Sequence, residues 1–187
     1  FASAEAAASR LESPITLVDS LGISLLQGLL VLKATEMAEL ATPPADIAAE
    51  LARVRRQSGI LFTVDRFDRL LASGRVGRGQ AWLGTVLGVK PILSLDVDGK
   101  IAPVGKAFGR RRVVPALVRA MMEQIPPGAD KIRFGIVHVA RPEIVEQASE
   151  AIRVRFGDVE ILSAPATPVI ATHLGVGGWG AGFIVED

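Results

Sequence analysis

Residues 168–182 (PVIATHLGVGGWGAG) contain the side chains and backbone best suited to binding a ligand. His173 stands between an apolar run and five glycines. Glycine lets the backbone approach a ligand closely, and a histidine can donate, accept or attack. The same pattern also fits a structural role, in which His173 ends a short helix and the glycines form a turn. The residues alone leave both interpretations open.

The composition is that of a hydrophobic chain with almost no net charge. Of its 187 residues 49% are hydrophobic, the mean hydropathy is +0.37 and the formal charge is +1. The longest apolar stretch, residues 21–32, is shorter than the roughly 20 residues of a membrane span, so we expect a buried helix there. The charge argues against a nucleic-acid partner. Because no signal peptide is visible, a cytoplasmic location is expected.

The absence of cysteine and the scarcity of histidine limit the possible chemistry. Without cysteine, disulfides, thiolate catalysis and cysteine metal sites are excluded. The two histidines, His138 and His173, are far apart in sequence, so no metal cluster is predicted. We expect His138 to be structural, and Asp19 and Asp65 to cap the elements that follow predicted strands.

The first part of the chain is predicted to alternate helices with short buried strands. Helices are expected over residues 2–11, 23–41 and 43–58, the last with Thr42 as N-cap and Pro43 in its first turn. Strands are expected over residues 15–18 and 60–64. Continuous apolar strands that alternate with helices predict a parallel sheet covered on both faces.

The second part is predicted to hold a mixed sheet. The glycine-rich residues 74–88 are expected to form a loop and a short helix at a boundary between two substructures, residues 1–85 and 86–187. Strands over 92–96 and 101–106 flank Asp98-Gly99, a strong hairpin signal. Further strands are expected over 132–139, 159–162 and 183–185, and helices over 111–124, 142–156 and 168–174.

Basic residues are concentrated in residues 74–112. There are eight, against two acidic residues, and they are Arg75, Arg78, Lys90, Lys100, Lys106, Arg110, Arg111 and Arg112. This pattern suits a docking surface for an acidic partner or a phosphate-bearing ligand. The alternative is ordinary solvated charge. No phosphate-binding glycine motif precedes a helix, so a nucleotide-binding loop is not expected.

Five segments, in order along nearly the whole chain, resemble the DegV family. They are VDS at 18–20, LLVLKATEMAE at 29–39, FTVDRFDRLLASGRVGRGQAWLGTVLGVKPIL at 62–93, DGKIAPVGKAFGRRR at 98–112 and TPVIATHLGVGGWGAGFI at 167–184. Members of this family are fatty-acid-binding proteins that serve as acyl-carrying subunits of bacterial fatty acid kinase. The resemblance implies an α/β fold with two domains: a parallel-sheet N-terminal part, incomplete here, and a mixed-sheet C-terminal domain.

The resemblance also implies a site. His173 would bind the carboxylate of a long-chain fatty acid, within a block that includes Thr172, Gly175, Gly177 and Gly178. The Thr and Ser that assist it belong to TSQP-like and SSGxSG-like motifs that are absent here, so we expect the chain to be the later part of a longer protein.

The family's basic face, which engages the kinase, corresponds here to Arg75, Arg110, Arg111 and Arg112. Phe108 stands where the family commonly has an arginine, which puts the details of kinase docking in doubt.

The expected function is therefore that of a non-enzymatic carrier, with a fatty acid as ligand, a separate kinase as partner and no cofactor. Each buried CH₂ contributes about 0.8 kcal/mol, so the ligand requires an apolar tunnel with few polar groups. Two alternatives stay open. One is a substrate-binding subunit like that of dihydroxyacetone kinase, in which His173 bonds covalently to a carbonyl. The other is a lipid-sensing regulatory module.

Overall fold

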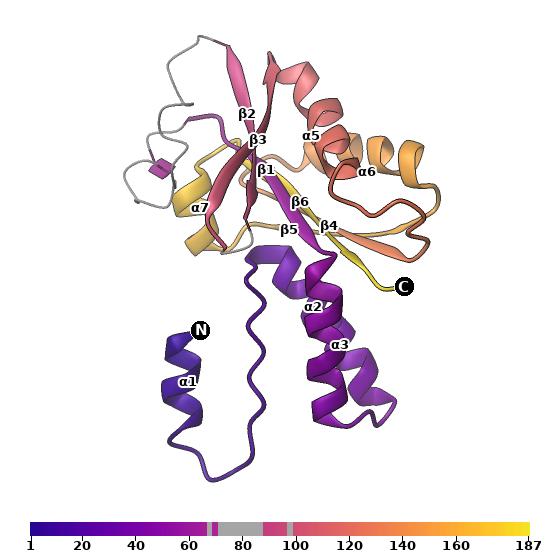
Figure 1. Cartoon of the computed structure of the whole chain (residues 1–187). Coiled ribbons are helices and arrows are strands. Elements are labelled where there is room, and N and C mark those ends of the chain that lie inside the picture. The colour runs from indigo at the N-terminus through magenta and orange to yellow at the C-terminus, as the bar shows by residue number, and fades with distance from the viewer. Residues whose placement is uncertain (67–68, 71–87, 97–98) are drawn as a thin grey trace.

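A six-stranded mixed sheet forms the centre of the protein (Figure 1). The computed structural model describes residues 1–66, 69–70, 88–96 and 99–187. The strands are β1 (Gly59–Thr63), β2 (Val89–Leu95), β3 (Ile101–Phe108), β4 (Ile132–His138), β5 (Glu160–Pro165) and β6 (Trp179–Val185), in the order β3-β2-β1-β6-β4-β5. Strands β4 and β5 are parallel, and every other neighbouring pair is antiparallel.

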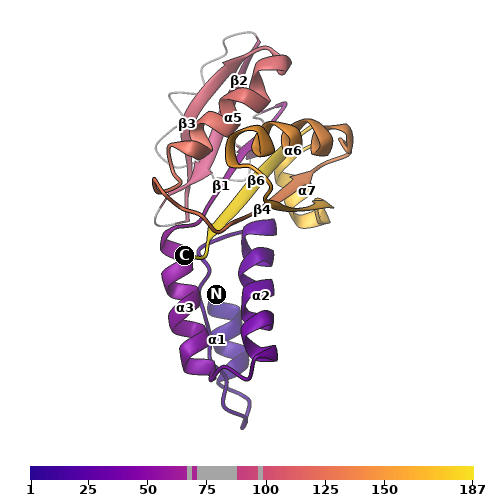
Figure 2. The same cartoon turned by 90° about the vertical axis from the view of Figure 1, so that its right-hand side faces the viewer.

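Helices α5 (Val113–Met122) and α6 (Glu143–Phe156) cover one face of the sheet (Figure 2). Side chains alternate along β1, since successive residues of a strand point to opposite faces. Leu61 joins the core beneath α5 and α6, whereas Ile60 and Phe62 belong to two other apolar clusters. Those clusters include α2 (Ser24–Glu39), α3 (Pro44–Arg56) and α7 (Pro168–Leu174). The face opposite α5 and α6 is therefore the one that meets the glycine-rich C-terminal segment.

Helix α2 packs very close to the sheet because β4 and β6 each carry a glycine beneath it. A Cβ on Gly135 of β4 would lie 2.8 Å from the Cβ of Leu25, and one on Gly182 of β6 would lie 3.3 Å from the backbone nitrogen of Leu26. Helices α2 and α3 form a pair that extends beyond the sheet, and α1 (Ala2–Ala8) stands apart from them with no buried residue, on the other side of the extended segment that leads to α2 (Figure 1).

An ion-pair network joins α2 to the strands, centred on the nearly buried Arg133 of β4. Its guanidinium contacts Glu36 of α2 at 2.7 Å, Glu160 of β5 at 3.1 Å and Glu186 at 3.2 Å. The Glu186 side chain is only 1% exposed and also pairs with Lys33 and Lys131. The hydrogen bond from Arg133 lowers the pKa of Glu36. Such a pair therefore stabilises the fold at neutral pH and ceases to do so once acid protonates the carboxylate.

Most of the elements predicted from the sequence are confirmed. Helices 23–41, 142–156 and 168–174 correspond to α2, α6 and α7, and the 92–106 hairpin corresponds to β2 and β3. Helix 111–124 begins two residues later than expected, after a 3₁₀ turn at Arg110–Arg112. The loop and short helix expected within residues 74–88 lie outside the described residues, apart from Gly88.

Three predictions for the first part are wrong. Residues 15–18 are not a buried strand: they form an extended, exposed segment in which Ile15 is 45% exposed. A parallel sheet does not form there, because β1 is antiparallel to both β2 and β6. Pro43, not Thr42, is the N-cap of α3. An Ile15–Val18 strand would need a partner, and the described strands supply none.

The described residues form a single α/β domain. Strand β1 precedes the expected boundary at residue 85, yet it lies in the same sheet as all the later strands. The division into residues 1–85 and 86–187, within a two-domain protein, stays a prediction. No helix in the described ranges is long and apolar enough to cross a membrane.

Replacing Arg133 with methionine is expected to lower the free energy of unfolding by about 3 kcal/mol, since it removes the buried cation of the network and leaves the buried Glu186 carboxylate with only Lys33 and Lys131 as partners. Urea unfolding at pH 7 measures the loss. The difference from wild type should shrink as pH falls below about 4.5, the ordinary pKa of a glutamate, toward the lowered pKa that the Arg133 hydrogen bond gives Glu36.

Lys131→Met is the matched control, because its side chain is 66% exposed and pairs with the same Glu186. It should cost less than about 1 kcal/mol. Equal losses for the two variants would contradict a central role for Arg133.

Two adjacent cavities form the candidate functional site

An apolar cavity lies on the sheet face opposite α5 and α6, between α7 and the beginning of α2. Its volume is about 610 Å³, within the range typical of small-molecule sites. Ten of the fourteen described lining residues are apolar: Ile23, Ile60, Phe62, Leu70, Leu95, Ile101, Val137, Val169, Ile170 and Leu174. They come from α2, α7 and four strands, together with the segment just after β1. We call this space the apolar cavity.

His173 lines the apolar cavity. It occupies the last turn of α7, which begins with Pro168 and ends at Gly175, where φ is 72°. A proline suits the first turn of a helix and a glycine suits the left-handed residue that ends it, which explains the short length of α7. The imidazole is half-buried and makes no hydrogen bond to the described residues. Both ring nitrogens are therefore available to a ligand.

Two further polar residues line the apolar cavity and were not singled out as binding residues from the sequence. Ser24 begins α2 with φ at 56°, an uncommon backbone conformation for a residue other than glycine. Lys100 lies in the β2–β3 turn, where its backbone N–H donates to the Asp96 carboxylate at 2.8 Å. Sequence spacing carries no signal for either, because only the fold brings residues 24, 100 and 173 to one cavity.

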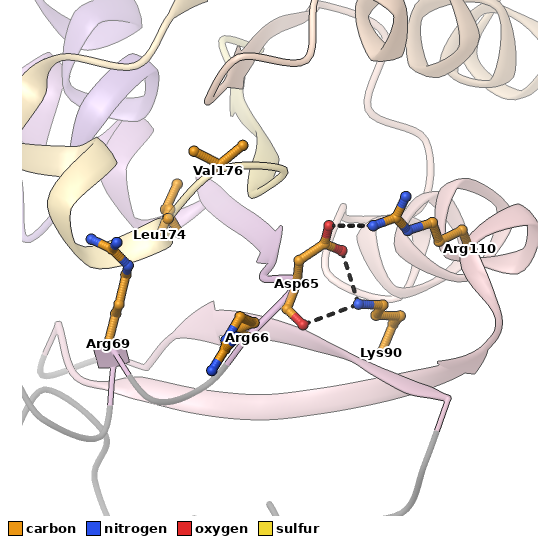
Figure 3. Close-up of a pocket in the computed structure, with 8 residues that line it drawn as sticks. Asp65, Arg66, Arg69, Lys90, Arg110, Leu174 and Val176 are labelled. Carbon is orange, nitrogen blue, oxygen red and sulfur yellow. Dashed lines mark hydrogen bonds and ion pairs between the residues drawn. The ribbon is translucent and has the colours of Figure 1, made fainter.

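A second cavity, which we call the basic pocket, is shown in Figure 3. It has a volume of about 350 Å³ and shares Leu174 with the apolar cavity. Its lining consists of Asp65, Arg66, Arg69, Lys90, Arg110, Leu174, Gly175 and Val176. The described lining therefore holds one carboxylate and four cationic side chains, from three separate segments of the chain.

Asp65 holds two of those cations. Its Oδ1 accepts a bond of 2.8 Å from Lys90 Nζ, and its Oδ2 accepts one of 2.7 Å from Arg110 (Figure 3). Gly177 makes room for this carboxylate, since a Cβ there would lie 2.4 Å from Oδ2. Asp65 thus anchors a charge network between strands, where the sequence analysis expected a cap.

The other predicted ligand-binding residues do not line the apolar cavity. Gly175 lines the basic pocket and Gly177 abuts Asp65, so neither faces the apolar cavity. Gly178 packs against Leu174, with a would-be Cβ 2.9 Å from the Leu174 Cβ. The exposed Thr172 hydroxyl donates to the Pro168 carbonyl at 2.8 Å, within its own helix. Their role in ligand binding stays a prediction.

The predicted docking residues are only partly described. Arg75 lies outside the described residues. Arg110, Arg111 and Arg112 form the exposed 3₁₀ turn before α5, and Arg110 also lines the basic pocket. Phe108 is 55% exposed, with the Lys106 ammonium 5.8 Å from its ring centroid.

The remaining polar candidates have local contacts. Nδ1 of His138 accepts a bond of 3.2 Å from the backbone of Arg141, in keeping with the structural role expected for it. Asp19 accepts the backbone N–H of Leu21 at 2.9 Å, as a local cap. Within the described ranges, no group of three or more His, Asp or Glu residues could hold a metal ion.

Comparison with known proteins places this arrangement in a family. The family model for uncharacterised proteins of the DegV family matches residues 1–186. Protein DegV of Bacillus subtilis is 32% identical over 182 residues, covering 96% of this chain and 64% of that protein. A fatty acid-binding protein of Thermotoga maritima is 28% identical, covering 99% of this chain and 64% of its own length.

A solved structure agrees with these sequence relatives. The fatty acid-binding DegV family protein from Thermus thermophilus is 31% identical and superposes with a TM-score of 0.90, covering 98% of this chain and 65% of that one. This chain spans slightly less than two-thirds of the length of each of these three relatives. The match of the family model over nearly the whole chain decides the assignment: this chain belongs to the DegV family.

Proposed function

We propose that the chain holds a long-chain fatty acid, with the acyl chain in the apolar cavity and the carboxylate at His173. The observation that carries this proposal is the combination of ten apolar lining side chains with a half-buried imidazole that has no hydrogen-bond partner among the described residues. Relatives from Thermotoga and Thermus are described as fatty-acid-binding proteins, which supports the same ligand class.

The energetics favour such a ligand. Burial contributes about 0.8 kcal/mol for each CH₂ removed from water, so a long acyl chain supplies most of the binding free energy. Its carboxylate must keep hydrogen bonds or it will be neutralised. The polar side chains of His173, Ser24 and Lys100 line the cavity and are the candidate donors. Gly175, Gly177 and Gly178 would act indirectly, by shaping the turn that seats His173.

We further propose that the bound acid is presented to a separate fatty acid kinase, which transfers the phosphoryl group. In the described lining of the apolar cavity, Ser24 and His173 share no hydrogen bond and so do not form an activated nucleophile, which supports a carrier role for this chain. Docking would use the exposed basic turn Arg110–Arg112, together with Arg75, which lies outside the described residues.

Replacing Ile170 with aspartate is expected to remove bound fatty acid, because a carboxylate placed in the cavity wall repels the ligand and wets the cavity. Native mass spectrometry of protein purified from cells measures occupancy, and titration with palmitic acid should show affinity at least about tenfold weaker. Val154→Asp on α6 is the matched control, since Val154 is 75% exposed and lines no part of this cavity. If the wild-type chain carried no fatty acid and bound none, the proposal would be wrong.

Replacing His173 with alanine is expected to weaken palmitate binding about tenfold or more, the worth of a hydrogen bond to a charged group. His138→Ala, which removes the other histidine, should leave the affinity unchanged. A covalent mass increase on His173 after exposure to dihydroxyacetone would instead favour the carbonyl-binding function.

The double charge reversal Arg111→Glu/Arg112→Glu is expected to reduce acyl-phosphate formation by the partner kinase while palmitate binding persists. Arg110 is left intact because it pairs with Asp65. Arg10→Glu, after α1, serves as the charge control. Unchanged kinase turnover in the double variant would exclude this turn as the docking surface.

A further inference from the structure

We propose that residues 19–24 form a strap that opens and closes the apolar cavity, and that Arg55 is the latch that holds the strap shut. The inference rests on the proposed binding function, because it concerns how an apolar ligand enters that cavity. The strap follows the extended segment between α1 and α2 and ends with the first residue of α2 (Figure 1). Two of its residues, Ile23 and Ser24, line the cavity, so a movement of the strap would open the cavity wall.

The strap borders the turn between β2 and β3. Gly99 and Lys100 of this turn line the same cavity. A Cβ on Gly99 would lie 3.7 Å from the carbonyl oxygen of Leu21, so the strap and the turn are in contact. They are adjacent parts of one wall, and a strap that moved away from the turn would leave the cavity open on this side.

Arg55, in the last turn of α3, ties the strap to the body of the protein. Its Nε donates to the Ser20 carbonyl, and one terminal nitrogen donates to the Leu21 carbonyl at 3.0 Å. The other terminal nitrogen donates to the Ser58 carbonyl at 3.4 Å, next to the start of β1. Burial lowers the pKa of the Arg55 guanidinium, while the charge of Asp19 acts in the opposite direction. Hydrogen bonds from a partly desolvated cation are stronger than those of a solvated one.

Little else holds the strap in place. The hydrogen bonds of the Asp19 and Ser20 side chains stay within the strap itself. Among the described residues, the two bonds from Arg55 are the only hydrogen bonds that join residues 19–22 to another element. Apolar packing is incomplete as well, since Leu21 is 41% and Ile23 is 37% exposed.

Backbone strain at two positions of the strap opposes the latch. Leu21 has φ at 43° and Ser24 has φ at 56°, in the left-handed region that residues with a Cβ rarely adopt. Opening the strap would let both residues relax. A segment with strained residues, exposed side chains and few hydrogen bonds opens locally more readily than the core of a domain. The two Arg55 bonds therefore set how often the strap opens.

The test is stopped-flow fluorescence with N-phenyl-1-naphthylamine, a neutral apolar dye. Arg55→Met is expected to release the dye at least about tenfold faster than wild type, because two hydrogen bonds from a charged group are lost. Hydrogen–deuterium exchange of residues 19–24, measured without the dye, should also become faster. Ile170→Asp should abolish dye uptake, as expected if the dye occupies the apolar cavity.

Two further variants control for indirect effects. Arg56→Met changes the next residue, which is exposed and makes no hydrogen bond to the described residues, so it should behave like wild type in both measurements. Leu21→Asn should act in the opposite direction and slow both dye release and exchange, because asparagine adopts the left-handed conformation at a lower cost than leucine. Thermal unfolding verifies that each variant is folded.

The proposal is overturned if the wild-type chain takes up no dye, or if Arg55→Met and Arg56→Met release it at the same rate. It is also overturned if Arg55→Met leaves the exchange of residues 19–24 unchanged. Because the dye has no carboxylate, it reports on the strap even in a chain that binds no fatty acid. Failure of the lipid proposal and failure of this one are therefore distinguishable.

Discussion

The insertion of β6 between β1 and β4 is the constraint on which the rest of the structure depends. It joins the antiparallel set β3-β2-β1 to the pair β4-β5, so one sheet forms where two could have remained apart. All seven residues of β6 are buried. A short turn joins α7 to β6, so the register of β6 against β1 and β4 sets the position of His173.

The last residue of the short helix α7, Leu174, lies between two cavities whose linings differ in chemistry. The α7 side of the apolar cavity presents Val169, Ile170 and His173, and beyond Leu174 the lining changes to arginine and lysine. Lys100 is the one cation in the described lining of the apolar cavity, whereas four cationic side chains line the basic pocket.

The sequence predicted best where local chemistry decides structure. Pro168 and Gly175 define α7 to the residue, and Gly99, with φ at 74°, lies between β2 and β3 where the sequence predicts a hairpin turn. His173 was identified because the glycines after it form a strong local signal. The prediction of a buried strand over residues 15–18 is wrong because hydrophobic residues are buried only where another surface covers them. None of the described elements provides such a surface here.

Long-range features could not be predicted in the same way. Asp65, Lys90 and Arg110 meet only because β1, β2 and β3 are neighbours, which is a property of the sheet order. Ser24 and Lys100 reach the apolar cavity for similar reasons. Gly180 and Gly182, the last two of the five glycines after His173, are needed within β6 itself. A Cβ on Gly180 would lie 2.7 Å from the Leu61 carbonyl oxygen, and one on Gly182 would meet α2.

The central place of β6 also has a consequence for how the protein is made. Gly59 of β1 pairs with Phe183 of β6, a separation of 124 residues along the chain. During synthesis, β1 therefore leaves the ribosome long before β6 is made. Until then, the edge of β1 that pairs with β6 has no partner strand. The entropy cost of closing this long loop must be overcome before the contacts between β1 and β6 can stabilise the sheet, so the sheet forms late and slowly. An exposed strand edge of this kind is a hazard for aggregation, which makes the nascent chain a natural client for chaperones.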